Sequence, residues 1–161
     1  MRRMMASVCA VLAAILLWSC SDASFHEEHR TVDRGGWNYT DTLTFQVPVD
    51  EPTDSLLLSI YTRHTVDFGW RNAWVRIVSV APGGDTARAR YDLKLSQPSG
   101  EWYGRCRGDV CQLTQPVDYP IELADTGIYV FHLLQDMRVD PLTDVLAMGI
   151  RLDRTPPDEL D

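Results

Sequence analysis

Alternation of apolar and polar residues with a period of two runs through most of the chain. In residues 43–47, leucine, phenylalanine and valine alternate with threonine and glutamine, and Pro48 ends the run. Residues 87–95 alternate in the same way, with alanine, tyrosine and leucine at odd positions and charged residues at even positions. This period is typical of β-strands that have one buried face.

Other segments predict strands that are buried more evenly. Residues 55–62 and 128–134 are apolar at both odd and even positions, which favours places in the middle of a sheet, and we expect residues 128–134 to be packed on both sides. Residues 73–80 lie just before Pro82-Gly83-Gly84-Asp85, so we expect a hairpin between this segment and residues 87–95. The remaining expected strands are short ones at 110–114 and 121–123, separated by Pro116 and Pro120, and a last one at 146–152.

After the first twenty residues, no long segment has the 3.6-residue period of an amphipathic helix. Only residues 141–146 could form a single helical turn. The pattern therefore predicts an all-β fold, an antiparallel β-sandwich of about seven to eight strands, for which a jelly roll is one arrangement. We place this single domain at residues 39–153 and a disordered tail at 154–161.

The first twenty residues have the features of an export signal. Two arginines precede an apolar segment at residues 6–18, which is shorter than the roughly 20 residues of a membrane-spanning helix. The segment ends in Leu17-Trp18-Ser19-Cys20, which is typical of a bacterial lipoprotein processing site. We expect residues 1–19 to be a cleaved signal peptide and Cys20 to carry the lipid, palmitate included. An uncleaved membrane anchor is the alternative.

Residues 20–38 are polar and charged without apolar periodicity, and we interpret them as a flexible tether. They include His26-Glu27-Glu28-His29, which is one residue shorter than the zinc-binding pattern His-Glu-x-x-His. A solvated charged segment is the better interpretation of this run.

The charge balance narrows the range of partners. Fifteen basic residues against 23 acidic ones give a net charge of −8, so we expect no nucleic-acid partner. The chain also lacks the nucleophile-elbow, phosphate-loop and dinucleotide-binding motifs. We therefore expect no enzyme activity, no cofactor and no metal.

Two cysteines remain within the expected domain, Cys106 and Cys111. An even pair in an exported chain favours a disulfide over a metal site, which would need two further ligands. Gly108-Asp109 between them suits a tight turn that brings the sulfurs together.

Four residues are candidates for partner or ligand contact. Trp70 and Trp102 lie in glycine-containing loops, where a tryptophan can be an exposed platform for a sugar or part of the core. Arg63 and Arg138, like Arg71, lie at strand ends and could hold partner carboxylates or form internal ion pairs. His132 lies in an apolar strand and is more simply a satisfied core or interface residue.

An ordered set of motifs resembles the gliding motility lipoprotein GldH family of the Bacteroidetes over residues 39–153. The motifs are Arg63, Phe68-Gly69-Trp70-Arg71-Asn72, Trp102-Tyr103-Gly104, Gly127-Ile128-Tyr129-Val130-Phe131, Gln135-Asp136-Met137-Arg138 and Met148-Gly149-Ile150. The resemblance implies an envelope lipoprotein associated with the gliding machinery and its linked secretion system.

We therefore expect a non-enzymatic lipoprotein, anchored to a membrane and facing the periplasm or the cell surface, that works by contact with other envelope proteins. A carbohydrate-binding envelope lipoprotein is the alternative, because the expected sandwich carries loop tryptophans that could bind a glycan.

Overall fold

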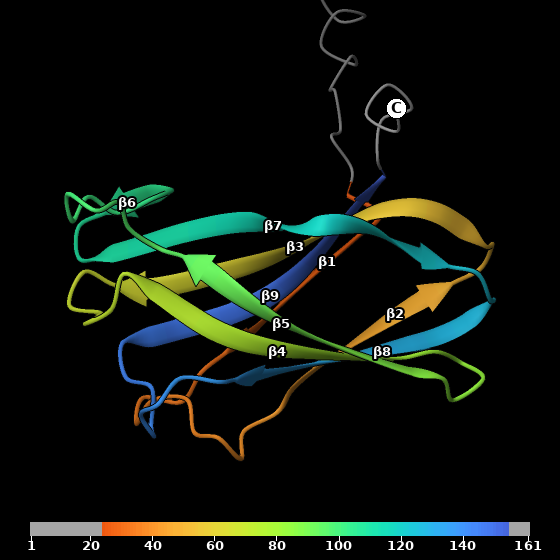
Figure 1. Cartoon of the computed structure of the whole chain (residues 1–161), viewed down its shortest axis with the longest axis horizontal. Helices are drawn as coiled ribbons and strands as arrows, with labels where there is room; N and C mark the ends of the chain where they lie inside the picture. Colours follow the sequence, from red (N-terminus) through yellow and green to blue (C-terminus); the bar gives the residue numbers. More distant parts are fainter. Residues whose placement is uncertain (1–23, 155–161) are drawn as a thin grey trace, which may run out of the picture.

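In the part of the chain that the structure describes, nine strands form two antiparallel sheets that face each other (Figure 1). The computed structural model describes residues 24–154, except for the side chains of residues 54–55 and 118–120. The strands are β1 (His26–Thr31), β2 (Leu43–Val49), β3 (Thr53–Thr65), β4 (Asn72–Val80), β5 (Thr86–Lys94), β6 (Arg105–Arg107), β7 (Val110–Leu123), β8 (Gly127–Gln135) and β9 (Val145–Arg154). The predicted all-β sandwich is confirmed.

The order of the strands is that of a jelly roll with one extra edge strand. The five-stranded sheet has the order β1-β9-β3-β7-β6, and the four-stranded sheet has the order β2-β8-β4-β5. Only two connections stay within one sheet, the hairpins β4–β5 and β6–β7, and every other connection in the described chain crosses to the opposite sheet. The predicted hairpin around the Gly83-Gly84 turn is thus confirmed.

The core lies between the sheets and draws on alternate positions of the strands. In β3 the residues at positions 56, 58 and 60 are buried, and in β8 those at 129, 131 and 133. Both strands lie in the interior of their sheets, as their apolar character predicts. The opposite face of β8 is only partly covered, and Ile128 on that face is exposed, so this strand is not packed equally on both sides.

The prediction of a flexible tether over the whole of residues 20–38 is wrong for β1. Residues 26–31 pair over their whole length with residues 147–152 of β9, from His26 opposite Leu152 to Thr31 opposite Ala147. An apolar alternation is missing because β1 is an edge strand that exposes most of its side chains, and the pairing is between backbones. Some of the charged side chains of β1 form ion pairs with each other, such as Arg30 with Glu28 at 2.5 Å.

Two further boundaries differ from the sequence prediction. Residues 110–123 form a single strand, β7, with register shifts in its pairing with β3, where two separate short strands were expected. Register shifts let an antiparallel strand continue past a proline such as Pro116, which cannot donate a ladder hydrogen bond. No helical turn occurs at residues 141–146. Strand β9 runs to Arg154, and residues 155–161 lie outside the described residues.

Candidate functional site

Trp70 and Arg138, both candidates from the sequence, line one hollow on the outer side of the four-stranded sheet. The hollow has a volume of about 400 Å³ and is lined by Trp70, Trp74, Arg90, Asp136, Met137 and Arg138. We call it the Trp70 groove. Trp70 is 46% exposed, and Arg138 is exposed as well. Two motif segments that are far apart in the sequence, 68–72 and 135–138, therefore meet at this groove.

Asp136 is shared by two arginines, Arg90 at the groove and Arg76 beside it. Arg76 and Arg90 stand directly opposite each other across β4 and β5. Asp136 Oδ2 accepts from Arg90 Nε at 2.5 Å, and Oδ1 forms an ion pair with Arg76 Nε at 3.2 Å. Because two like charges opposite each other on neighbouring strands repel, a shared carboxylate stabilises their arrangement.

Trp74 forms the apolar wall beside this ion cluster. The guanidinium carbon of Arg90 lies 3.8 Å from the centroid of the Trp74 ring, which is a cation–π contact. The Trp74 backbone N–H lies 3.1 Å from the thioether of Met137, and its carbonyl accepts from the Asp136 N–H at 2.8 Å. The backbone of Trp74 is thus tied to Asp136 and Met137 and its ring contacts Arg90, whereas Trp70 is exposed.

A buried glutamine fixes the loop that carries Asp136, Met137 and Arg138. Gln135 has no exposed surface, and its amide nitrogen donates to the carbonyls of Val139 at 3.1 Å and Trp37 at 3.4 Å. Its amide oxygen accepts from the Met137 N–H at 2.9 Å. One side chain therefore satisfies three backbone groups, and it ties the loop to the end of β8.

The segment after β1 braces the same loop from outside. The Tyr39 hydroxyl donates to the carbonyl of Met137 at 2.6 Å, and the Tyr39 N–H donates to Asp140 at 2.9 Å. Trp37 is buried and exchanges backbone hydrogen bonds with Leu142 in both directions. Trp37 and Tyr39 are thus structural aromatics, and the groove is supported by a segment that the sequence prediction placed at the edge of the domain.

The second candidate tryptophan lies in different surroundings. Trp102 is partly buried, with its ring centroid 4.6 Å from that of His64 and 6.5 Å from that of Phe68. It packs against the core at the end of the five-stranded sheet and is not a lining residue of the Trp70 groove. The two tryptophans therefore do not form one aromatic platform.

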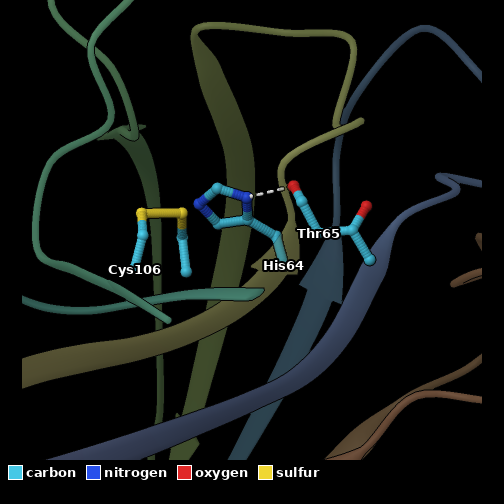
Figure 2. Close-up of a disulfide and its surroundings, with 4 residues drawn as sticks. His64, Thr65 and Cys106 are labelled. Carbon is cyan, nitrogen blue, oxygen red and sulfur yellow. Dashed lines mark hydrogen bonds between the residues drawn. A yellow bond between two sulfur atoms is a disulfide. The ribbon is translucent and has the colours of Figure 1, made fainter. Parts of the chain in front are cut away.

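Cys106 and Cys111 form the expected disulfide, and they face each other across the β6–β7 hairpin. A two-residue turn at Gly108-Asp109 joins these strands, and Gly108 has a φ of 56°, which favours glycine. Figure 2 shows the imidazole of His64 between this disulfide and Thr65.

His64 was not singled out from the sequence. It is fully buried, and its Nδ1–H donates to the carbonyl of Thr65 at 2.8 Å. Burial lowers the pKa of His64, although the hydrogen bond to Thr65 raises it in part. Its Nε2 has no hydrogen-bond partner among the described residues. The neutral imidazole is therefore the favoured form.

The remaining candidates lie apart from the groove or outside the described chain. Arg63 is exposed on the outer face of the five-stranded sheet. Arg71 is exposed, and its carbonyl accepts from the N–H groups of Leu95 and Ser96. His132 is partly buried on the outer face of β8, 3.0 Å from the Thr44 hydroxyl. Cys20 lies outside the described residues.

Sequence reasoning missed the residues that hold the groove together. Gln135 and Asp136 were noted only as part of a family motif, and Arg90 only as one charged position in an alternating strand. A glutamine at the inward-facing end of an apolar strand was the available signal, because such a side chain is buried only when its amide is satisfied.

Among residues 24–154 no cluster of three or more histidine, cysteine or acidic side chains has the arrangement of a metal site. The same part of the chain contains no helix that is long and apolar enough to cross a membrane.

Comparison with known proteins identifies the family. A family model described as GldH lipoprotein matches residues 24–152. The gliding motility lipoprotein GldH of Flavobacterium johnsoniae is 24% identical over 151 residues, covering 89% of this chain and 93% of the relative. A GldH homolog of Christiangramia forsetii is 20% identical over 152 residues, covering 90% and 93% respectively. The chain belongs to the GldH lipoprotein family.

Proposed function

We propose that this chain is a non-enzymatic, lipid-anchored envelope protein that works by contact with other proteins of the gliding motility and associated secretion machinery. The family and the names of its relatives support the motility context. The observation that carries the contact role is the exposed Trp70 beside Arg138 in a rigid groove. Tryptophan and arginine are the residue types that most often dominate the binding energy of protein interfaces.

The Trp70 groove is well suited to this role because it is already ordered. Gln135 and Tyr39 hold the loop that carries Arg138, and Asp136 holds Arg90, which lines the groove. A partner that binds such a surface loses little free energy to the ordering of loops and side chains. Arg138 is left as an exposed guanidinium that can pair with a carboxylate of the partner.

Affinity purification of the full-length protein from the envelope of its host tests the contact role. The proteins recovered with the wild type are compared with those recovered with Trp70→Ala and Arg138→Ala. We expect both variants to lose one or more envelope partners, while Arg88→Ala, on exposed β5 outside the groove, retains them. Equal recovery with all four proteins would contradict the role of the groove.

The anchor is the second part of the proposal. Acylation of Cys20 would leave only residues 21–25 between the lipid and the start of β1 at His26. Such a connection spans at most about 20 Å when fully extended. The domain then works close to the membrane surface, in the periplasm or at the cell surface. Palmitate labelling that is unaffected by Cys20→Ala would contradict the anchor.

Carbohydrate binding is the second candidate function. The exposed indole of Trp70 beside the polar side chains Asp136 and Arg138 also suits a sugar ring, whose apolar face stacks on aromatic surfaces. A glycan array probed with the purified protein distinguishes the two candidates. Specific binding that Trp70→Ala abolishes would favour the sugar, and an array without binding would remove it.

A further inference from the structure

Three arginines surround a separate hollow on the outer face of the five-stranded sheet. This arginine pocket has a volume of about 320 Å³ and is lined by Arg63, Arg105, Arg107, Val110 and Gln112. It lies at the β6–β7 hairpin, which forms one end of the long axis of the molecule (Figure 1). Neither the motility context nor the Trp70 groove accounts for it.

The pairing of the strands brings these arginines together. Arg63 on β3 stands opposite Gln112 on β7, and Gln112 stands opposite Arg105 on β6, so the three form a row across the sheet. Arg107 lies two residues beyond Arg105 and therefore points to the same face. All three arginines are exposed.

The charge of this row is not balanced from within the described chain. None of the three arginines makes an ion pair with an acidic residue whose side chain the structure describes, and no acidic residue lines the pocket. Gln112 accepts weakly from the Tyr61 hydroxyl at 3.4 Å, which leaves its NH₂ group as a donor. The pocket thus offers hydrogen-bond donors and positive charge in a protein whose net charge is −8.

The backbone beneath the pocket is held rigidly. The Cys106–Cys111 disulfide, on the inner side of the hairpin, links β6 to β7 between the two arginines of β6. Gly104, with a φ of 80°, lies directly against β7 just before Arg105. A side chain at this position would collide with the backbone of Gln112, so the close approach requires glycine. Arg105 and Arg107 therefore start from fixed positions, which lowers the entropic cost of binding a ligand.

We propose that the arginine pocket binds a phosphate group. A phosphate monoester has close to two negative charges and three terminal oxygens, and arginine forks pair with such oxygens in bidentate fashion. Three guanidinium groups from two strands match that charge and number of acceptors better than they match one carboxylate. The phosphate group is either free in solution or part of a lipid head group.

The position of the pocket leaves both sources open. Leu58 on β3 is in register, through Leu152 on β9, with His26 at the start of β1. Arg63 lies five residues further along β3, about 17 Å from that level. The pocket thus lies at a distance from the point where the described chain begins. Its arginines are exposed, so a phosphate group in solution can also reach it.

Titration of the full-length protein in an uncharged detergent tests the proposal. The probes are inorganic phosphate, dihexanoyl phosphatidic acid and acetate, and binding is followed by calorimetry. We expect saturable binding of at least one phosphate compound. Arg63→Gln and Arg105→Gln should weaken it about tenfold or more, since each removes charged hydrogen bonds. Arg88→Gln, an exposed arginine on β5, should change it less than about twofold.

The pattern of binding identifies the source. Comparable affinity for both phosphate compounds supports a free phosphate group as the ligand, and binding of phosphatidic acid alone supports a lipid head group. Thermal unfolding of each variant checks that the fold is intact. The proposal would be overturned if neither phosphate compound bound, if acetate bound as tightly as the phosphate compounds, or if Arg88→Gln weakened binding as much as Arg63→Gln.

Discussion

The two outer faces of the sandwich treat clustered arginines in opposite ways. On the four-stranded sheet, Arg76 and Arg90 face each other and Asp136 bridges them. On the five-stranded sheet, Arg63 and Arg105 flank a neutral Gln112, and the described residues supply no carboxylate. The first cluster has a counter-charge within the chain, and it lies beside the groove that we propose as the contact surface. The second cluster keeps its charge available for a ligand from outside.

This difference separates supporting residues from contact residues. At the Trp70 groove, Arg90 and the neighbouring Arg76 are paired with Asp136, so we propose the exposed Trp70 and Arg138 as the contact residues. In the arginine pocket every lining arginine is exposed and able to bind. Whether a cluster of arginines supports the structure or could bind a ligand therefore depends on whether acidic side chains lie beside it.

The largest expected effect follows from removing the support of the Asp136 loop. Gln135→Leu would leave the Met137 N–H and the Val139 carbonyl without their buried partner. We expect a loss of about 2–3 kcal/mol in the free energy of unfolding, measured by urea denaturation. Gln46→Leu, at an exposed position of β2, is the control and should change stability by less than about 0.5 kcal/mol. Similar losses in both variants would contradict the role of Gln135.

Reduction of the disulfide tests the rigidity of the arginine pocket. Opening the small loop between Cys106 and Cys111 should cost about 2 kcal/mol of stability from loop-closure entropy. The phosphate affinity of the pocket should fall, because Arg105 and Arg107 are no longer held in place. Denaturation and titration with and without reductant measure both effects. An unchanged phosphate affinity after reduction would show that the hairpin does not need its cross-link for binding.

The buried His64 beside the disulfide predicts a dependence of stability on pH. Its pKa is lowered in the folded state by burial, from an ordinary value of 6.5. Below about pH 6.5 the unfolded chain therefore binds a proton that the folded chain does not, so stability falls as the pH falls, by up to about 1.4 kcal/mol per pH unit. Urea denaturation between pH 5 and 8 checks this trend. His64→Leu should have a smaller slope, and an equal slope would assign the effect to other groups.

Asp136→Asn breaks the comparison between the two faces from one side. It keeps the shape of the side chain but removes the charge that Arg76 and Arg90 share. We expect a loss of about 1 kcal/mol at low salt, since the cluster is partly exposed. The loss should shrink as salt screens the remaining repulsion. A loss that is independent of salt would mean that Asp136 acts through its hydrogen bonds alone.

Arg63→Gln breaks the comparison from the other side and has the smallest expected effect. It removes one of several like charges that have no counter-charge within the described chain. We expect stability to stay the same or to rise by a few tenths of a kcal/mol at low salt in the absence of phosphate. Thermal unfolding in a phosphate-free buffer measures this change. A clear loss of stability would show that Arg63 is paired within the protein.

The sequence predicts the sandwich well because strands with one buried face leave a regular pattern. Of the eight expected segments, seven lie within strands of the structure, with 110–114 and 121–123 merged into β7, and residues 87–95 extend one residue past the end of β5. Strand β1 leaves no such pattern, since its side chains are charged and its stability comes from pairing with β9. Local periodicity cannot report a contact with a strand more than a hundred residues away.

The site was less accessible to sequence reasoning than the fold. Single residues such as Trp70 and Arg138 could be selected, because tryptophan and arginine in loops are typical of contact surfaces. Their proximity depends on the pairing of β4 with β8, and the arginine row depends on the order β3-β7-β6. These relations follow from the topology of the whole chain, so they become visible only in the structure.

A photo-activated cross-linker placed at position 70 of the full-length protein in its host tests the central claim most directly. We expect a discrete adduct with one envelope protein, which disappears when Arg138→Ala is added and which does not form from a cross-linker at position 88 on β5. An absence of adducts from position 70, or the same adducts from both positions, would contradict the Trp70 groove as the contact surface.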